Sequence, residues 1–385
     1  MEKKALTMLA VGDISLGLPH AESFFELAAP TLRRADVVVG QVEHVFTVRG
    51  IKTRADITAP PCDPLNMKAF QYAGINVSTL AGNHIWDSGP PGIEDTISGF
   101  RNYAIAVVGA GMNMDEAKRP AIVEKQGMRI GFLDYNCVGP KETWAGQDKA
   151  GCAYVHIITH YELDNPSPGG PPTIFTFPEP QSLEAMLNDV KKLRPLCDVL
   201  VVTLHKGIGH TPVKIAKAEQ DISYAAIDAG ADLILGHHAH ILKGVEVYKN
   251  RVIFHGLCNF VTVVTHLTED PIKGSQPWAR RRKELFGFTP DPEYPTYPFH
   301  PDAKYTIIAK CIIEEGKIKR VSYLPCLMNK QGQPEILKND DRGKQVFAYM
   351  DKITKEANLN TKFVWKGNEV VIHTNTNAFS SVTIL

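Results

Sequence analysis

Three histidines stand within four positions of residues 233–242, which read L-I-L-G-H-H-A-H-I-L. The apolar run before them is typical of a short buried strand of a parallel sheet that ends in a glycine turn. Histidines are poor core residues, because each ring carries a donor and an acceptor that need partners when buried. Open α/β sheets bind ligands just beyond the carboxyl ends of their strands. The segment therefore predicts a metal site.

Other apolar runs end in polar residues of the same chemistry. The candidate ligands and their neighbours are Asp13 in V-G-D-I-S-L-G, Glu43 in G-Q-V-E-H, Asn83 and His84 in A-G-N-H-I-W-D, His205 in L-H-K-G, and His238 and His240 in G-H-H-A-H. Carboxylate and amide oxygens with imidazole nitrogens, and no thiolate, suit cations such as Mn²⁺, Fe²⁺ or Zn²⁺. Alternation in an extended segment puts His238 and His240 on one side, so His237 is expected outside the ligand set.

The elements that must position these residues alternate between strands and helices. The apolar runs that precede the polar positions predict buried strands at residues 6–11, 37–39, 77–80, 199–204 and 233–235. Amphipathic patterns at residues 182–193 and 216–229 predict helices, which makes β-α-β units with strands buried on both faces. Three further apolar runs predict antiparallel strands at residues 252–254, 305–313 and 318–323. The sequence E-E-G-K between the last two predicts a hairpin turn.

The predicted fold class is α/β, with one domain over residues 1–330. Segments at about 160–180, rich in proline and glycine, and at 266–301 are expected to be loops or insertions over one rim of the sheet. Residues 331–385 are expected to form a C-terminal extension packed on the same domain, with a helix and hairpin added from Lys352 onward.

Composition excludes several classes of partner. Acidic and basic residues balance at 42 each, so no global field attracts nucleic acid or an anionic membrane. Seven cysteines without a C-x-x-C pair favour reduced thiols, and the segment before Asp13 is too short for a signal peptide or membrane anchor. No dinucleotide fingerprint, P-loop or G-x-S-x-G elbow occurs. We expect a cytoplasmic protein without a membrane anchor, and leave its oligomeric state open.

The motifs also occur in a recognisable order. Six motifs follow one another within residues 6–260. In chain order they are G-D, a glutamate segment, G-N-H-x-x-D, H-x-G, G-H-H-x-H and G-V-E-V-Y-x-x-R-V-I-F-x-G-L-C-N-F. This order resembles the CapA (poly-γ-glutamate capsule biosynthesis) family, a branch of the calcineurin-like metallophosphoesterases. The resemblance implies a two-sheet α/β sandwich with flanking helices. It also implies two metals about 3.5 to 4 Å apart, a separation that suits two-metal hydrolysis.

The resemblance also implies roles for individual residues. Glu43 would bridge the metals, Asp13 and His240 would hold the first, and the second would be held by Asn83, His205 and His238. His84 would act as acid or electrostatic stabiliser beside the attacked group, with Asp87 orienting it or capping the next helix. Ordinary phosphoesterases have a histidine two residues after the first aspartate, and this position is Ser15 here. The first metal then has three protein ligands, so one or two ions of Mn, Fe or Zn are expected.

Three residues are candidates for substrate binding. Lys206 replaces the family's usual aromatic residue after His205 and is predicted to point toward an anionic substrate. His237 and His255 are expected to border the cleft. Each also has a structural alternative, as a solvated lysine or as a histidine that forms hydrogen bonds in the core. The remaining polar residues near the motifs are expected to be structural: His210, His266 and Asn259.

Three hypotheses of function follow. The first is a metal-dependent hydrolase that uses an activated water to attack a phosphoester, or an amide or ester carbonyl, of a small-molecule or γ-glutamyl-type substrate. The second is an accessory component of poly-γ-glutamate synthesis or export without independent turnover, against which the expected lack of an anchor argues. The third is a binding protein that has lost one metal, as Ser15 suggests. The otherwise matched ligand set argues against it.

Overall fold

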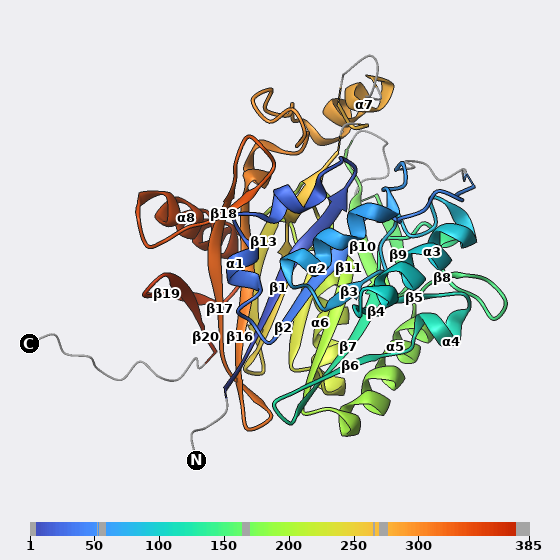
Figure 1. Ribbon diagram of the computed structural model, residues 1–385, viewed down its shortest axis with the longest axis horizontal. Helices are drawn as coiled ribbons and strands as arrows, with labels where there is room; N and C mark the ends of the chain where they lie inside the picture. The colour runs from blue at the N-terminus through green and yellow to red at the C-terminus, as the bar shows by residue number, and fades with distance from the viewer. Residues whose placement is uncertain are drawn as a thin grey trace, which may run out of the picture.

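The computed structural model describes residues 5–51, 53, 59–163, 170–264, 266–268 and 276–374. Two large sheets pack face to face, and helices cover their outer faces (Figure 1). This arrangement confirms the expected two-sheet α/β sandwich.

The first sheet has the order β19-β20-β17-β16-β1-β2-β3-β4, with β15 beside β1 and β18 beside β17. Its strands are β1 (Ala5–Leu16), β2 (Val37–Val42), β3 (Val77–Thr79), β4 (Ala106–Val108), β15 (Asn259–Val263), β16 (Tyr305–Glu314), β17 (Lys317–Met328), β18 (Pro334–Ile336), β19 (Lys362–Lys366) and β20 (Glu369–His373). Strands β1 to β4 are mutually parallel. Their carboxyl ends therefore lie at one edge of the sheet.

The second sheet has the order β13-β14-β12-β11-β7-β6. Its strands are β6 (Ala121–Lys125), β7 (Met128–Asn136), β11 (Val199–Lys206), β12 (Leu233–His238), β13 (Leu242–Tyr248) and β14 (Arg251–Leu257). Strand β14, expected to be antiparallel, is parallel to β12 and antiparallel only to β13, because it returns from a hairpin at the sheet edge. The hairpin of β6 and β7 was not predicted, since Gly131 and the buried Asp134 interrupt its apolar run.

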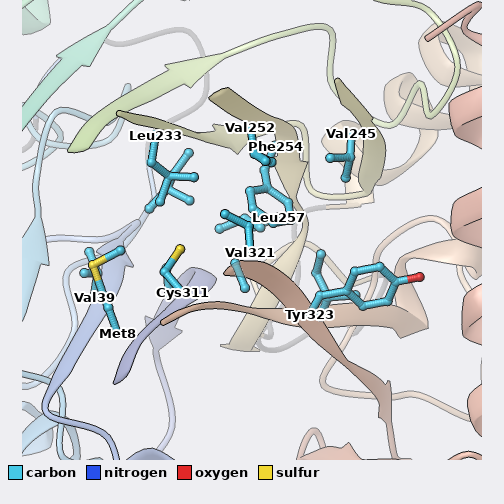
Figure 2. Packing of buried hydrophobic residues seen from close by; sticks show 14 of the residues in the cluster. Met8, Val39, Leu233, Val245, Val252, Phe254, Leu257, Cys311, Val321 and Tyr323 are labelled. Atoms are coloured by element: carbon cyan, nitrogen blue, oxygen red, sulfur yellow. The ribbon is translucent and has the colours of Figure 1, made fainter. Parts of the chain in front are cut away.

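The main core lies between the two sheets. Met8 and Val39 of the first sheet face Leu233 and Phe254 of the second (Figure 2). The helices are α1 (Ala29–Leu32), α2 (Lys68–Ala73), α3 (Gly89–Asn102), α4 (Met114–Ala117), α5 (Pro180–Leu193), α6 (Lys217–Ala229), α7 (Gln276–Phe286) and α8 (Asp341–Glu356). Helices α2 and α3 belong to the hydrophobic cluster outside the first sheet, and α5 and α6 to the cluster outside the second. The central strands are therefore apolar on both faces.

Two segments expected to be loops contain regular structure. The antiparallel pair β9 (Ile157–Glu162) and β10 (Thr173–Pro178) overlaps the first of them, and α7 lies within the second. Ile174, Phe175 and Phe177 supply the β-propensity that the neighbouring proline and glycine residues concealed. A second small pair joins β5 (Ala110–Gly111) to β8 (Gly151–Cys152).

The C-terminal region extends the first sheet. Strand β20 pairs with β17, and α8 buries Val346, Met350 and Ile353 in the core between the sheets. That residues 331–385 form an extension packed on the same domain stays a prediction, and residues 375–385 lie outside the described residues. No helix among the described residues is long and apolar enough to cross a membrane.

Candidate metal centre

The predicted ligands come from strand ends of both sheets. Asp13 lies in β1 and Glu43 directly follows β2, while His205 and His238 stand at the ends of β11 and β12. The Asp13 backbone amide donates to the Cys258 carbonyl at 2.9 Å, at the point where β1 passes from β16 to β15. A Cβ atom at Gly12 would lie 2.0 Å from that carbonyl oxygen, so only glycine fits there. The close approach of these backbones fixes the position of Asp13.

Half of the site is formed by Asn83, His205 and His238. Oδ1 of Asn83 lies 2.7 Å from Nε2 of His205 and 3.1 Å from Nδ1 of His238, and the two ring nitrogens are 3.2 Å apart. Burial lowers the pKa of His238 to about 3 and that of His205 well below its usual value. Both rings are therefore neutral, which is the form that binds metal ions.

The other half is formed by Asp13, Glu43 and His240. Nδ1 of His240 lies 3.3 Å from Oδ2 of Asp13, and its Nε2 lies 3.3 Å from Oε1 of Glu43. The second oxygen of Glu43 lies 3.8 Å from Nε2 of His205. Burial opposes protonation of His240, but the carboxylates of Glu43 and Asp13 overcome it and raise the pKa of the ring. Glu43 thus stands between the two halves, as the bridging prediction requires.

The carboxylates at the centre accept few of the hydrogen bonds that buried charges need. The side chains of Asp13 and Glu43 are 0% and 2% exposed. Oδ1 of Asp13 and both oxygens of Glu43 accept no hydrogen bond from the described residues. Ligand atoms of Asp13, Glu43 and His205 all lie within 4.8 Å of one another. Because buried carboxylates are stable only when paired or bound to a cation, and because the donors are oxygen and nitrogen, these residues fit a divalent metal.

His84 and Asp87 lie beside this cluster. Nδ1 of His84 is 2.6 Å from Oδ2 of Asp87, which also accepts the Ala59 backbone amide at 2.6 Å. Nε2 of His84 lies 3.9 Å from Oε1 of Glu43. The ring lines a cavity of about 180 Å³, which is also lined by Glu43, Asn83, His238 and His240. Burial opposes protonation of His84, but Asp87 and then Glu43 raise its pKa. The geometry fits the predicted catalytic role, which stays a prediction.

The three residues predicted to bind substrate, Lys206, His237 and His255, do not line the metal cavity. Nζ of Lys206 donates to the Glu219 carbonyl and to Oγ of Ser223, and lies 3.1 Å from Nδ1 of His255. Neighbouring residues of a strand point to opposite faces, so Lys206 turns away from the face that carries His205. His255 is fully buried beside it. These positions do not fit direct contact with a substrate at the metals.

His237 is also withdrawn from the cleft. Its ring is buried, and its Nδ1 lies 3.3 Å from Oδ1 of Asp13. This position fits the structural alternative, a core histidine behind a metal ligand, better than substrate binding.

Several residues of the site were not predicted. Nε2 of Gln41 lies 3.2 Å from Nδ1 of His205, and Oδ1 of Asn259 lies 2.9 Å from Nδ1 of His240, so both amides orient ligand rings. Gln41 precedes Glu43 by two positions and so shares its face of the chain, a signal that the sequence did contain. His210 and His266, expected to be structural, line the metal cavity.

His44 adds an imidazole next to Ser15, the residue that stands where a histidine of ordinary phosphoesterases was expected. Its Nδ1 lies 2.7 Å from Oγ of Ser15, and its ring lines the same cavity as Glu43 and His84. Burial, together with the charges of His84 and His266, lowers the pKa of His44 well below its usual value. A neutral imidazole is therefore held close to the ligand set through Ser15.

Comparison with known proteins identifies the family. A family model described as bacterial capsule synthesis protein PGA_cap matches residues 7–263, which is more than half of the chain. The chain belongs to this family. The match spans every ligand position of the metal centre and confirms the resemblance to the CapA proteins.

Curated relatives agree with this assignment. Capsule biosynthesis protein CapA of Bacillus anthracis is 29% identical over 275 residues, covering 68% of this chain and 60% of that protein. PGA biosynthesis protein CapA of Bacillus subtilis is 29% identical over 261 residues, covering 65% and 62%. A probable polyglutamine synthesis accessory protein of Mycobacterium tuberculosis is 27% identical over 227 residues, covering 57% and 54%. The matched region thus spans less than two thirds of these relatives' length.

Solved structures show more distant likeness. A hypothetical protein from Thermus thermophilus has a TM-score of 0.45 at 16% identity, over 83% of this chain and 98% of that one. The calcineurin-like phosphoesterase YfkN of Bacillus subtilis has a TM-score of 0.40 at 14% identity, over 92% and 98%. TM-scores this low do not bear on function.

Proposed function

We propose that this member of the PGA_cap family is a metal-dependent hydrolase that cleaves a phosphoester, or an amide or ester bond. The observation that supports it most is the pair of buried carboxylates, Asp13 and Glu43, whose oxygens without hydrogen bonds lie within 4 Å of the rings of His205, His237 and His240. Asp13, Glu43 and His240 would hold one ion, and Glu43 with Asn83, His205 and His238 would hold the other. When bound, such ions polarise the oxygen under attack and lower the pKa of water toward neutrality.

The remaining steps fall to residues of the chain. His84 faces the cavity through Nε2 and is held at Nδ1 by Asp87, so its ring is fixed in rotation. Its raised pKa favours the protonated ring, which can donate a proton or a hydrogen bond to the leaving group. Phe286, Phe299 and Val264 form apolar walls of the same cavity.

The substrate we propose is a γ-glutamyl-type amide or a small phosphoester. The names of the relatives, which refer to PGA biosynthesis and polyglutamine synthesis, support the first. The mycobacterial relative is named an accessory protein, which supports a second candidate, a component of polymer synthesis or export without turnover of its own. The described cysteines are all buried as free thiols, which supports a reducing compartment such as the cytoplasm.

Metal analysis followed by an activity panel tests this proposal. The purified protein is stripped, reloaded with Mn²⁺, Fe²⁺ or Zn²⁺, and assayed against phosphoesters, γ-glutamyl amides and esters. We expect turnover that depends on metal and is lost in His205→Ala but kept in His373→Ala, an exposed histidine at the far end of β20. A metal-loaded protein that is inactive on the whole panel would support the accessory role instead.

A further inference from the structure

A second and larger cavity adjoins the metal centre. It has a volume of about 490 Å³ and shares His238 with the metal cavity. We call it the hairpin cavity, because Thr159 of β9 and Thr176 of β10 line one side, opposite Gly207 after β11. Its volume is typical of a site for a small ligand, although the hydrolase proposal assigns it no role.

One wall of the hairpin cavity is aromatic. Trp144 lines it and stacks on Tyr154, with ring centroids 4.1 Å apart and an interplanar angle of 7°. The stacking holds the indole in place, and Pro140 and Ile157 continue the apolar surface. A flat group or a run of methylenes would pack against this wall.

The charge offered to a ligand by the described lining residues is positive. Lys141 is exposed at the mouth, with Nζ 5.8 Å from the centre of the Trp144 ring. Glu219 is the one carboxylate among these residues, and it is turned inward. Its Oε1 accepts a hydrogen bond from the Ala216 backbone amide at 2.9 Å. Its Oε2 is buried against the Gly207 backbone, 2.9 Å from the place that a Cβ atom at this glycine would occupy. The cavity therefore favours a ligand that is anionic near the mouth.

We infer that the hairpin cavity is a subsite for an acidic acyl or peptide chain, with methylenes against Trp144 and a carboxylate toward Lys141. This inference rests on the hydrolase proposal. Because His238 borders both cavities, a chain that passes this residue would place one unit in the hairpin cavity and the adjoining bond at the metals. The substrate would then be an oligomer of acidic units, and the unit beside the cleaved bond would determine affinity.

Binding of a γ-linked glutamate trimer to the metal-loaded protein tests this subsite by calorimetry. Reversing the exposed charge with Lys141→Glu should weaken binding about tenfold or more, since a like charge would then face the carboxylate. Lys125→Glu is the matched control, because Lys125 is likewise exposed but lies on β6, away from both cavities. The neutral γ-linked glutamine trimer should bind about tenfold more weakly to the unmodified protein.

Turnover of a small phosphoester, p-nitrophenyl phosphate, separates the subsite from the hydrolase proposal. We expect it to be equal in Lys141→Glu, Lys125→Glu and the unmodified protein, because this substrate does not reach the subsite. Equal trimer affinity in the two variants, or equal affinity for the acidic and neutral trimers, would overturn the subsite even if the phosphoester is hydrolysed. Selective trimer binding without turnover of any substrate would retain the subsite and refute the hydrolase.

Discussion

Oδ1 of Asn83 and Nε2 of His205 lie 2.7 Å apart, although 122 positions separate them in the sequence. Asn83 follows a strand of the first sheet, and His205 ends a strand of the second. The contact therefore exists only because the two sheets pack face to face, with the carboxyl ends of their parallel strands at one rim. A metal centre built in this way depends on the packing between the sheets as much as on its ligands.

Gly12→Ala tests this dependence. The new Cβ would lie 2.0 Å from the Cys258 carbonyl oxygen, and relief would require separating β1 from the backbone that follows β14. We expect the free energy of unfolding to fall by about 3 kcal/mol or more, because strain at a packed backbone cannot relax locally. Urea unfolding measures the change, and Gly209→Ala, where no atom lies within 4 Å of the added carbon, is the control. Equal stability of the two variants would contradict the contact.

The two metal positions should differ in affinity. In the proposed site, Asp13, Glu43 and His240 would provide three ligands on one side, whereas Glu43, Asn83, His205 and His238 would provide four on the other. We expect graded chelation to remove the ion nearest Asp13 first, because fewer protein ligands hold it. Metal content per chain, followed against chelator concentration, should fall in two steps. A single step that releases both ions together would be inconsistent with this difference.

His84→Ala should lower turnover by about 10² to 10⁴ with metal content unchanged, since its ring faces the cavity without belonging to the ligand set. Asp87→Asn should have a smaller effect and change the pH profile. The Asp87 charge raises the pKa of His84, so its loss lowers that pKa. If activity requires the protonated ring, the fall of activity on the basic side of the pH profile would then occur at a lower pH than in the unmodified protein. Loss of metal in His84→Ala would make this residue a ligand, and full turnover would make it structural.

Lys206 should make stability depend on pH. Burial lowers the pKa of its ammonium from 10.5 to about 8, so between these values the unfolded chain holds a proton that the folded chain has released. The free energy of unfolding therefore rises with pH across this window, by about 3 kcal/mol for this group, and the gain is absent below pH 8.

Lys206→Met, which keeps a similar volume, should remove that rise. Urea unfolding at pH 7.5 and pH 10 gives the change for each protein, and the difference between the two isolates the lysine from other groups that titrate there. The same pH dependence in both proteins would show that the Lys206 ammonium is not desolvated in the folded state.

The sequence predicted the site residues that stand at the end of a single predicted strand. Asp13, Glu43 and His205 each follow or end an apolar run, and parallel strands bring such positions to one edge. Lys206 turns away from the face that carries His205, because consecutive residues of a strand point to opposite faces, and its contact with substrate stays a prediction.

The remainder depends on tertiary contacts. His44 and His266 line the metal cavity only because two separate segments meet there. Neither hydrophobic periodicity nor motif spacing in the sequence predicts this contact. The hairpin of β9 and β10 was obscured in the same way, by proline and glycine residues around a short aromatic strand. Both omissions concern the walls of the two cavities, which determine what the centre binds.

Anomalous X-ray scattering from crystals of the Mn²⁺- or Zn²⁺-loaded protein would locate the bound ions. We expect a peak among Glu43, Asn83, His205 and His238 at ligand distances of about 2.0 to 2.2 Å, with a second, weaker peak between Asp13 and His240. A fully loaded crystal with its ion bound elsewhere, or with three of the six side chains more than about 10 Å from the others, would contradict a metal centre at this rim.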